Sequence, residues 1–289
     1  MRMSYCTWGM MATPFEAGLP EIARIGYTGI ELAVTPGYDT ELYTLDAAKR
    51  KQFAQLLDQY NIVLAAIAGH TTVCEENPEK HAANMQRLRD TIDLADELRQ
   101  EGRTPVVVSY VGGHVDDWGR LKNLVVERVG ELGDYAASKD VIYAPEMHSG
   151  QAMDLPRKAV WLFEQVNHPY VKLNFDISHC EIVGMPTEEA CNAMCPHSVF
   201  THVKDQRGLY PNHEFLTPGS GPCDYVRYLK AMHAAGYTGF IGMEVSKMVQ
   251  SKPGYDYRVD AALGYYALKR AFNESGVPLD ESKPAYLTK

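Results

Sequence analysis

The sequence lacks several features that mark well-known classes of protein. None of its apolar stretches approaches about 18 residues, so we expect no membrane-spanning helix. Its 289 residues include 28 basic against 37 acidic side chains, and the net charge of -9 argues against a nucleic-acid partner, which needs a basic stripe. The opening "MRMSYCTWGM" lacks the charged-then-apolar layout of a signal peptide, and we therefore expect a cytoplasmic protein.

Paired cysteines and linkers are also missing. The six cysteines form no CxxC pair, and although Cys191 and Cys195 would share a helical face, no further zinc ligands stand at matching spacing. We expect reduced thiols, as is usual in a cytosolic protein. Because no low-complexity or linker segment interrupts the chain, we predict a single domain over residues 1–289.

Short β-rich runs recur along the chain, and most are almost continuously apolar, which is typical of parallel strands buried on both faces. These runs are residues 3–8, 29–34, 62–69, 105–112, 141–147, 171–177, 198–205 and 239–245. Amphipathic stretches that favour helices separate them, most clearly residues 47–60, 78–100, 116–138, 225–236 and 257–272. Alternation repeated eight times predicts an α/β protein, a single (β/α)8 TIM barrel.

Four of the predicted strands end in acids or an imidazole: Glu146, Asp176, His202 and Glu244. The carboxyl ends of barrel strands converge on one face, so these side chains could surround one ion. Three carboxylates and one imidazole form a hard, oxygen-rich site that suits Mn2+ first, with Mg2+, Co2+ or Zn2+ as alternatives. The other interpretations are a buried salt-bridge network or a metal-free scaffold, which would leave carboxylates buried without a partner.

Other side chains are expected to face the same pocket. His148 stands two residues after Glu146, on the same strand face, and could act as a further acid or base. Trp8, His70 and His114 follow strands one, three and four and are expected to line the pocket. Glu31 ends strand two in the same direction, and we expect it to face the substrate.

The segment "HVKDQRG" that contains His202 holds three more candidates. We expect Lys204 to face outward and Asp205 to orient His202 or reach the substrate, while Arg207 could bind a hydroxyl or phosphate, or form a surface ion pair. Residues 208–225 form a long loop rich in glycine and proline, which is a candidate lid. Its "PGSG" is a weak match to a phosphate-binding turn, because no GK[ST] follows.

The glutamate of strand five, "FDISH", "HVKD" and the "ME" of strand eight together resemble the xylose isomerase-like barrels, over essentially the whole chain. The resemblance implies a carbohydrate substrate, proton transfer by the two glutamates, and substrate contact by His179 and Arg207. It also implies metal binding by Glu146, Asp176, His202 and Glu244. The expected enzyme is a sugar isomerase or epimerase that removes a proton beside a carbonyl, through a metal-held enediolate.

The chain departs from one branch of that superfamily. Where ketose 3-epimerases carry a second glutamate, this chain has Ala152, and their Glu-x-x-Asn motif is replaced by "EMHSG". The alternative is therefore a β-eliminating lyase on keto-sugars or keto-glycosides, of the dehydratase or C-glycoside deglycosidase type. In that case His148 would join Glu146 and Glu244 as a catalytic residue. The chain could then be a homo-oligomer, or the catalytic subunit of a hetero-oligomer.

Overall fold

A closed barrel of parallel strands forms the centre of the protein in the computed structural model, which describes residues 1–282. Around the barrel the strands follow the order β1-β10-β7-β6-β5-β4-β3-β2. Their bounds are β1 (Arg2–Cys6), β2 (Gly29–Ala33), β3 (Val63–Ala68), β4 (Val106–Tyr110), β5 (Ile142–Glu146), β6 (Leu173–Asp176), β7 (Ser198–Val203) and β10 (Phe240–Met243). All eight predicted strands are present, and the predicted (β/α)8 TIM barrel is confirmed.

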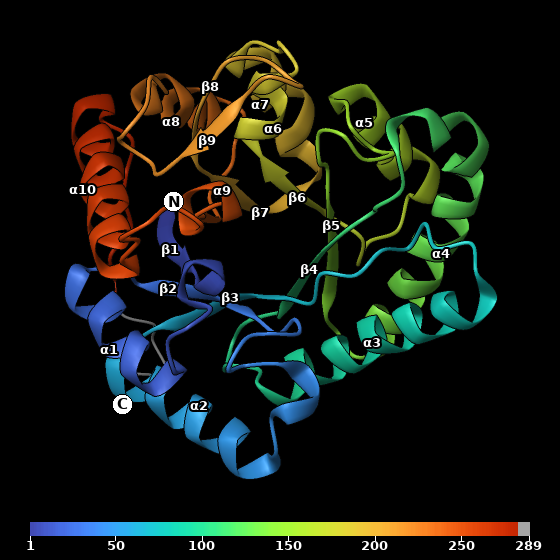
Figure 1. Cartoon of the computed structure of the whole chain (residues 1–289), viewed down its shortest axis with the longest axis horizontal. Helices are drawn as coiled ribbons and strands as arrows, with labels where there is room; N and C mark the ends of the chain where they lie inside the picture. Colours follow the sequence, from blue (N-terminus) through green and yellow to red (C-terminus); the bar gives the residue numbers. More distant parts are fainter. Residues whose placement is uncertain (283–289) are drawn as a thin grey trace.

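Helices surround the barrel in chain order, as Figure 1 shows, except the short α9, which lies inside the ring that the others form. They are α1 (Phe15–Ile25), α2 (Ala47–Tyr60), α3 (Pro78–Glu97), α4 (Trp118–Ser138), α5 (Pro156–Val166), α6 (Ile177–Ile182), α7 (Thr187–Met194), α8 (Tyr225–Ala234), α9 (Lys247–Gln250) and α10 (Tyr257–Ser275). The five predicted helices are confirmed, and α3 begins as a cap followed by proline should: the Asn77 side chain accepts hydrogen bonds from two backbone N–H groups, 3.1 Å each.

Two apolar clusters fill the protein. The larger one joins strand residues to the inner faces of the helices, while a smaller one is built from strand residues alone, including Val63, Val106, Ala144 and Phe200. The smaller cluster occupies the barrel interior, and the Phe200 ring lies edge-on to His202, 5.4 Å between ring centroids. His202 therefore lies where this apolar filling ends, towards the carboxyl ends of the strands.

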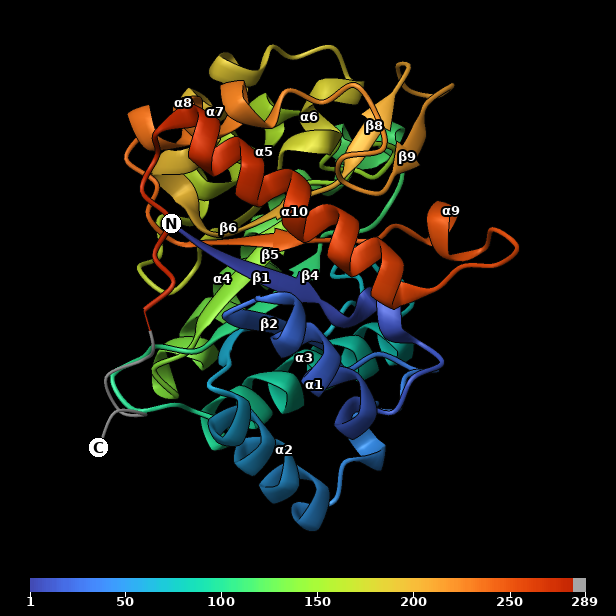
Figure 2. The ribbon, with the colours of Figure 1, turned by 90° about the vertical axis from the view of Figure 1, so that its left-hand side faces the viewer.

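The loops beyond those strand ends carry additional structure. The predicted lid loop contains a strand, β9 (Glu214–Leu216), that pairs antiparallel with β8 (Asp205–Arg207). In Figure 2 this hairpin and α9 lie on the side towards which β1 points, which is the carboxyl-terminal face of the barrel. In residues 1–282 no helix combines the length and the apolar character needed to cross a membrane.

Candidate functional site

Four potential metal ligands meet at the carboxyl-terminal face. Glu146 ends β5, Asp176 ends β6, His202 lies in β7, and Glu244 directly follows β10. One ligand atom from each lies within 4.8 Å of the others. The His202 Nδ1 atom is 3.5 Å from Glu146 Oε1 and 3.2 Å from Glu244 Oε2. The barrel therefore brings the predicted ligand set together.

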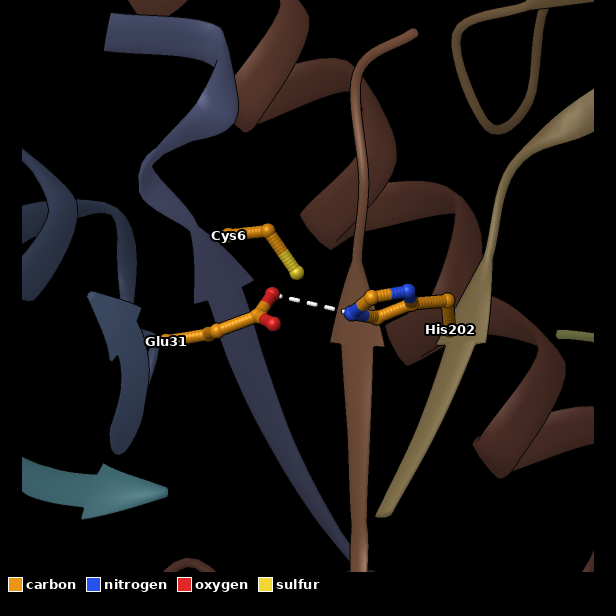
Figure 3. Close-up of side chains that lie close together, drawn as sticks. All are labelled: Cys6, Glu31 and His202. Carbon is orange, nitrogen blue, oxygen red and sulfur yellow. Dashed lines mark hydrogen bonds and ion pairs between the residues drawn. The ribbon is translucent and has the colours of Figure 1, made fainter. Parts of the chain in front are cut away.

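A contact with Glu31, on the side away from the other three ligands, sets the orientation of the His202 ring. Its Nε2 atom lies 2.9 Å from Glu31 Oε2 on β2, and Figure 3 shows the second ring nitrogen pointing away from Glu31. A ring that donates through Nε2 keeps a lone pair on Nδ1, which is the form a metal ligand requires. The Cys6 thiol lies beside this pair, and all three side chains are buried.

The donor set fits a divalent cation. Three carboxylates and an imidazole nitrogen suit a hard ion, and a carboxylate behind the imidazole is the usual support for such a ligand. Burial opposes a charge on His202, but Glu31 beside it raises the pKa of His202 well above its usual value, so the ring would give up one proton when it binds an ion. Glu146 Oε1 is buried and makes no hydrogen bond with any residue in 1–282, while Asn174 donates to its other oxygen at 3.0 Å. The Asn174 amide also lies 3.2 Å from His202 Nδ1. At 1% residue exposure this oxygen has the His148 and His202 nitrogens 3.3 and 3.5 Å away, and a bound cation would satisfy it more fully.

Lys204 contradicts the prediction that it faces outward. It is buried, and its Nζ atom lies 2.6 Å from Asp176 Oδ2 and 2.7 Å from Glu244 Oε2. The side-chain period of a strand is two residues, so Lys204 shares the inward face of His202. Burial lowers its affinity for a proton, but Asp176 and Glu244 outweigh burial and raise the pKa of Lys204 above its usual value. The site therefore contains a fixed positive charge of its own.

The glutamates of the site are held in the ionised form. Burial would raise the pKa of Glu146, but His148 and His202 beside it hold this pKa well below its usual range. Burial likewise opposes ionisation of Glu244, and Lys204 with His202 lowers the pKa of Glu244 nevertheless. Both carboxylates can thus accept a proton or bind a cation near neutral pH.

A cavity of about 510 Å³ opens beside the cluster, and Glu146 and Glu244 belong to its wall. A chain of aromatic rings forms one side. Trp8 contacts His70 at 4.6 Å between ring centroids, His70 contacts Tyr110 at 5.3 Å, and Tyr110 contacts His148 at 6.0 Å. Trp8 lies in a short 3-10 helix, Thr7–Met10, that follows β1 rather than in the strand itself.

Two histidines lie next to the ligands. The His148 Nε2 atom is 3.3 Å from Glu146 Oε1, and its ring lies 4.3 Å from that of His179, between centroids. His179 places Nδ1 2.9 Å from Ser149 Oγ and Nε2 3.8 Å from Asp176 Oδ2. Burial, reinforced by His148, holds the pKa of His179 well below its usual value, so this ring is neutral. Phe215 of the β8–β9 hairpin covers His179 edge-on at 5.2 Å.

Four of the predicted substrate contacts are absent from the cavity wall, namely His179, Glu31, His114 and Arg207. Glu31 is fully buried behind His202 and is absent from the cavity wall. The His114 side chain is 65% exposed, and its Nδ1 accepts from the backbone N–H of Asp116. Arg207 forms the alternative surface ion pair, with its Nη2 atom 2.5 Å from Glu214 and its side chain 66% exposed. A strand-end position alone does not separate these side chains from those that reach the cavity.

Asp205 neither orients His202 nor reaches the cavity. Its carboxylate accepts hydrogen bonds from the backbone N–H groups of Gly219, Gly221 and Cys223, at 3.2, 2.9 and 3.0 Å. Gly219 and Gly221 belong to the "PGSG" turn that was a weak match to a phosphate-binding turn. The carboxylate of the chain itself already occupies the place that an anion would take.

The amino-acid sequence is similar to those of known proteins. The model of the family described as "Xylose isomerase-like TIM barrel" matches residues 19–263. The chain belongs to this family. An inosose dehydratase from Geobacillus thermodenitrificans (strain NG80-2) is 23% identical over 271 residues, which cover 86% of this chain and 87% of that protein.

Solved structures share the fold. A D-tagatose 3-epimerase-like protein superposes with a TM-score of 0.76 at 18% identity, covering 96% of this chain and 98% of that one. The IOLI protein with a bound zinc atom superposes with a TM-score of 0.75 at 19% identity, over 95% of this chain and 98% of that one. At these identities the likeness to the two structures is one of fold.

Sequence reasoning missed Asn174, Tyr110 and the inward direction of Lys204. Asn174 stands two residues before Asp176 in the same apolar run, so strand periodicity could have identified it. The same periodicity relates Lys204 to His202. Tyr110 ends β4, and its position at a strand end could have identified it as the others were identified.

Proposed function

We propose that the protein is a divalent-metal-dependent enzyme of sugar isomerase or epimerase type, which removes a proton beside the carbonyl of a sugar or keto-sugar. The observation that carries the proposal is that Glu146 and Glu244 belong both to the four-donor cluster and to the cavity wall. A substrate in the cavity would therefore lie against two ionised carboxylates.

Glu146, Asp176, His202 and Glu244 would hold the ion, which is Mn2+ in this proposal. When bound, such an ion polarises a substrate carbonyl and so acidifies the neighbouring C–H. Glu146 or Glu244 accepts that proton, and the other glutamate can return one to the opposite face of an enediolate, which gives an epimer. Return to the neighbouring carbon gives an isomer. The aromatic wall from Trp8 to His148 would hold the apolar face of the sugar ring and exclude water.

Exchange of hydrogen for deuterium tests the proposal. Purified protein with Mn2+ in D2O should introduce deuterium at the carbon beside the carbonyl of a substrate keto-sugar, and NMR locates the position. Asp176→Asn is the matched control, because it removes a ligand without removing either proposed base. Turnover without exchange from solvent, or equal exchange by the control, would refute metal-assisted proton abstraction.

A lyase is the second candidate, and two observations favour it. His148 lies 3.3 Å from Glu146, where it could protonate a leaving group. The cavity also shares Met11, Lys247 and Gln250 with an outer pocket of about 710 Å³, which Tyr255 and Tyr257 line as well. A keto-glycoside could place its sugar in the inner cavity and its second group in the outer pocket.

His148→Ala separates the two candidates. In an epimerase the glutamates supply both bases, so the variant should lose about tenfold in rate, or about 1.4 kcal/mol. In a β-eliminating enzyme it should lose on the order of 10²–10⁴-fold with its metal content intact. The assay compares free ketoses with keto-glycosides, and release of an aglycone by the wild type from glycosides alone would refute the epimerase.

Assembly and location remain predictions. The proposed partners are a small carbohydrate and either a second copy of this chain or a different subunit, and the proposed location is the cytoplasm. Size-exclusion chromatography of the isolated chain distinguishes a monomer from a homo-oligomer. Activity that appears only after a second protein is added would support the hetero-oligomer.

A further inference from the structure

Lys204 occupies an unusual position among the proposed ligands. Its ammonium group bridges two carboxylates from different strands, 2.6 Å from Asp176 and 2.7 Å from Glu244. The residue is 2% exposed, and its Nζ atom also lies 5.1 Å from the centroid of the Phe215 ring on β9. These contacts fix the ammonium group at the place where the two carboxylates face each other.

The electrostatics of the cluster favour a positive charge at this place. Glu146, Asp176 and Glu244 place carboxylate oxygens within 4.8 Å of one another in a buried site. Like charges at this distance repel strongly when water is excluded. In the protein without metal, Lys204 offsets this repulsion for the two carboxylates that it bridges.

The contact of Lys204 with the two carboxylates also competes with the binding of a metal ion. The oxygen atoms that face Lys204, Asp176 Oδ2 and Glu244 Oε2, belong to two of the proposed metal ligands. A cation that binds there must share these oxygens with an ammonium group already in hydrogen-bond range. Lys204 is absent from the cavity wall, so its role is exerted through the carboxylates rather than through the substrate.

We propose that Lys204 is a built-in counter-ion, a positioning residue that keeps Asp176 and Glu244 assembled in the metal-free protein and competes with the divalent ion for them. The proposal rests on the metal site of the proposed function. It predicts that the chain folds into a stable barrel without metal and binds the ion less tightly than its ligands alone would allow.

The test compares Lys204→Met with Lys204→Arg and with Lys247→Met. Methionine keeps much of the length of the side chain and removes the charge, whereas arginine keeps the charge. Lys247 lines the neighbouring cavity and forms no ion pair with these carboxylates, so its replacement removes the same charge nearby without the contact. Each variant is stripped of metal, its thermal unfolding is followed, and Mn2+ is titrated by calorimetry.

Lys204→Met without metal should melt at a lower temperature than the wild type, and it should bind Mn2+ about tenfold more tightly. Lys204→Arg should retain the stability of the metal-free wild type, and Lys247→Met should change neither quantity. Equal or weaker Mn2+ binding by Lys204→Met overturns the proposal. A wild type that binds no Mn2+ overturns the metal site and this proposal together, whereas a wild type that binds and an unchanged variant overturn only the role of Lys204.

If Lys204→Met folds only with metal, the loaded proteins are mixed with excess chelator and the release of Mn2+ is timed. Slower release than from the wild type supports the counter-ion, and equal or faster release contradicts it.

Discussion

Asp176 and Asp205 are both buried aspartates near the ends of neighbouring strands, yet their surroundings differ completely. Asp205 accepts hydrogen bonds from the backbone of Gly219, Gly221 and Cys223, and all of its partners belong to its own loop. One oxygen of Asp176 is held by Ser178, while the other faces Lys204 and the ligand cluster. A buried carboxylate therefore marks a candidate functional site when one of its oxygens faces charged side chains of other strands.

The largest effect that would distinguish Asp176 from Asp205 is expected from Asp176→Asn. The amide keeps the shape of the side chain but loses the charge and one acceptor, so metal affinity should fall by at least about 100-fold, the upper end of the cost of losing an outer partner. Elemental analysis of protein purified without chelator should find about one divalent ion per wild-type chain. Full occupancy in the variant would remove Asp176 from the ligand set.

Asp205→Ala should give the opposite result. Loss of the carboxylate leaves backbone N–H groups of the loop without their acceptor in a largely buried place, which should cost about 3 kcal/mol of unfolding free energy. Urea denaturation measures this cost. Metal content should stay at the wild-type level, and a loss of metal equal to that of Asp176→Asn would show that the two aspartates are not distinct in role.

Glu31→Ala should have an intermediate effect on the site. The ring of His202 would lose the acceptor of its Nε2–H, so the lone pair on Nδ1 would no longer be fixed towards the cluster. We expect metal affinity to fall about 10- to 100-fold, with the fold preserved. Calorimetric titration with Mn2+ and circular dichroism measure the two properties, and unchanged affinity would contradict the positioning role.

The smallest expected effect is a dependence of the free energy of unfolding on pH in the metal-free protein. The pKa values of Glu146 and Glu244 are lowered in the folded chain, so their contribution to stability is present above the unfolded value of about 4.3. It is lost as pH falls further, through the lowered folded values, by up to about 1.4 kcal/mol per pH unit for each group. Urea unfolding between neutral pH and about pH 3 measures this slope. Glu244→Gln should reduce it, and an unchanged slope would contradict the lowered pKa.

Much of the architecture could be predicted from the sequence because it depends on local patterns. Apolar runs alternating with amphipathic segments defined the eight strands, and parallel strands in a barrel must end on one face. This geometry was sufficient to bring Glu146, Asp176, His202 and Glu244 together as candidates.

Some predicted positions of side chains were wrong, and two of these depended on contacts between residues that are distant in the sequence. Glu31 and Glu244 were both expected at strand ends, but Glu31 lies in the middle of β2, and its side chain lies behind His202. Arg207 was assigned by resemblance, and the β8–β9 hairpin directs it to Glu214 on the surface. Lys204 was a failure of local reasoning, because strand periodicity alone relates it to His202.

The hydrogen bond between Glu31 and His202 has a consequence for the order of assembly. It joins residues 171 positions apart in the chain, on strands β2 and β7, which are separated around the barrel by β1 and β10. During synthesis β10 is the last strand of the barrel to emerge, and Glu244 follows it. The complete set of donors therefore exists only after the barrel has closed, so uptake of a divalent ion would report that the last strand has taken its place.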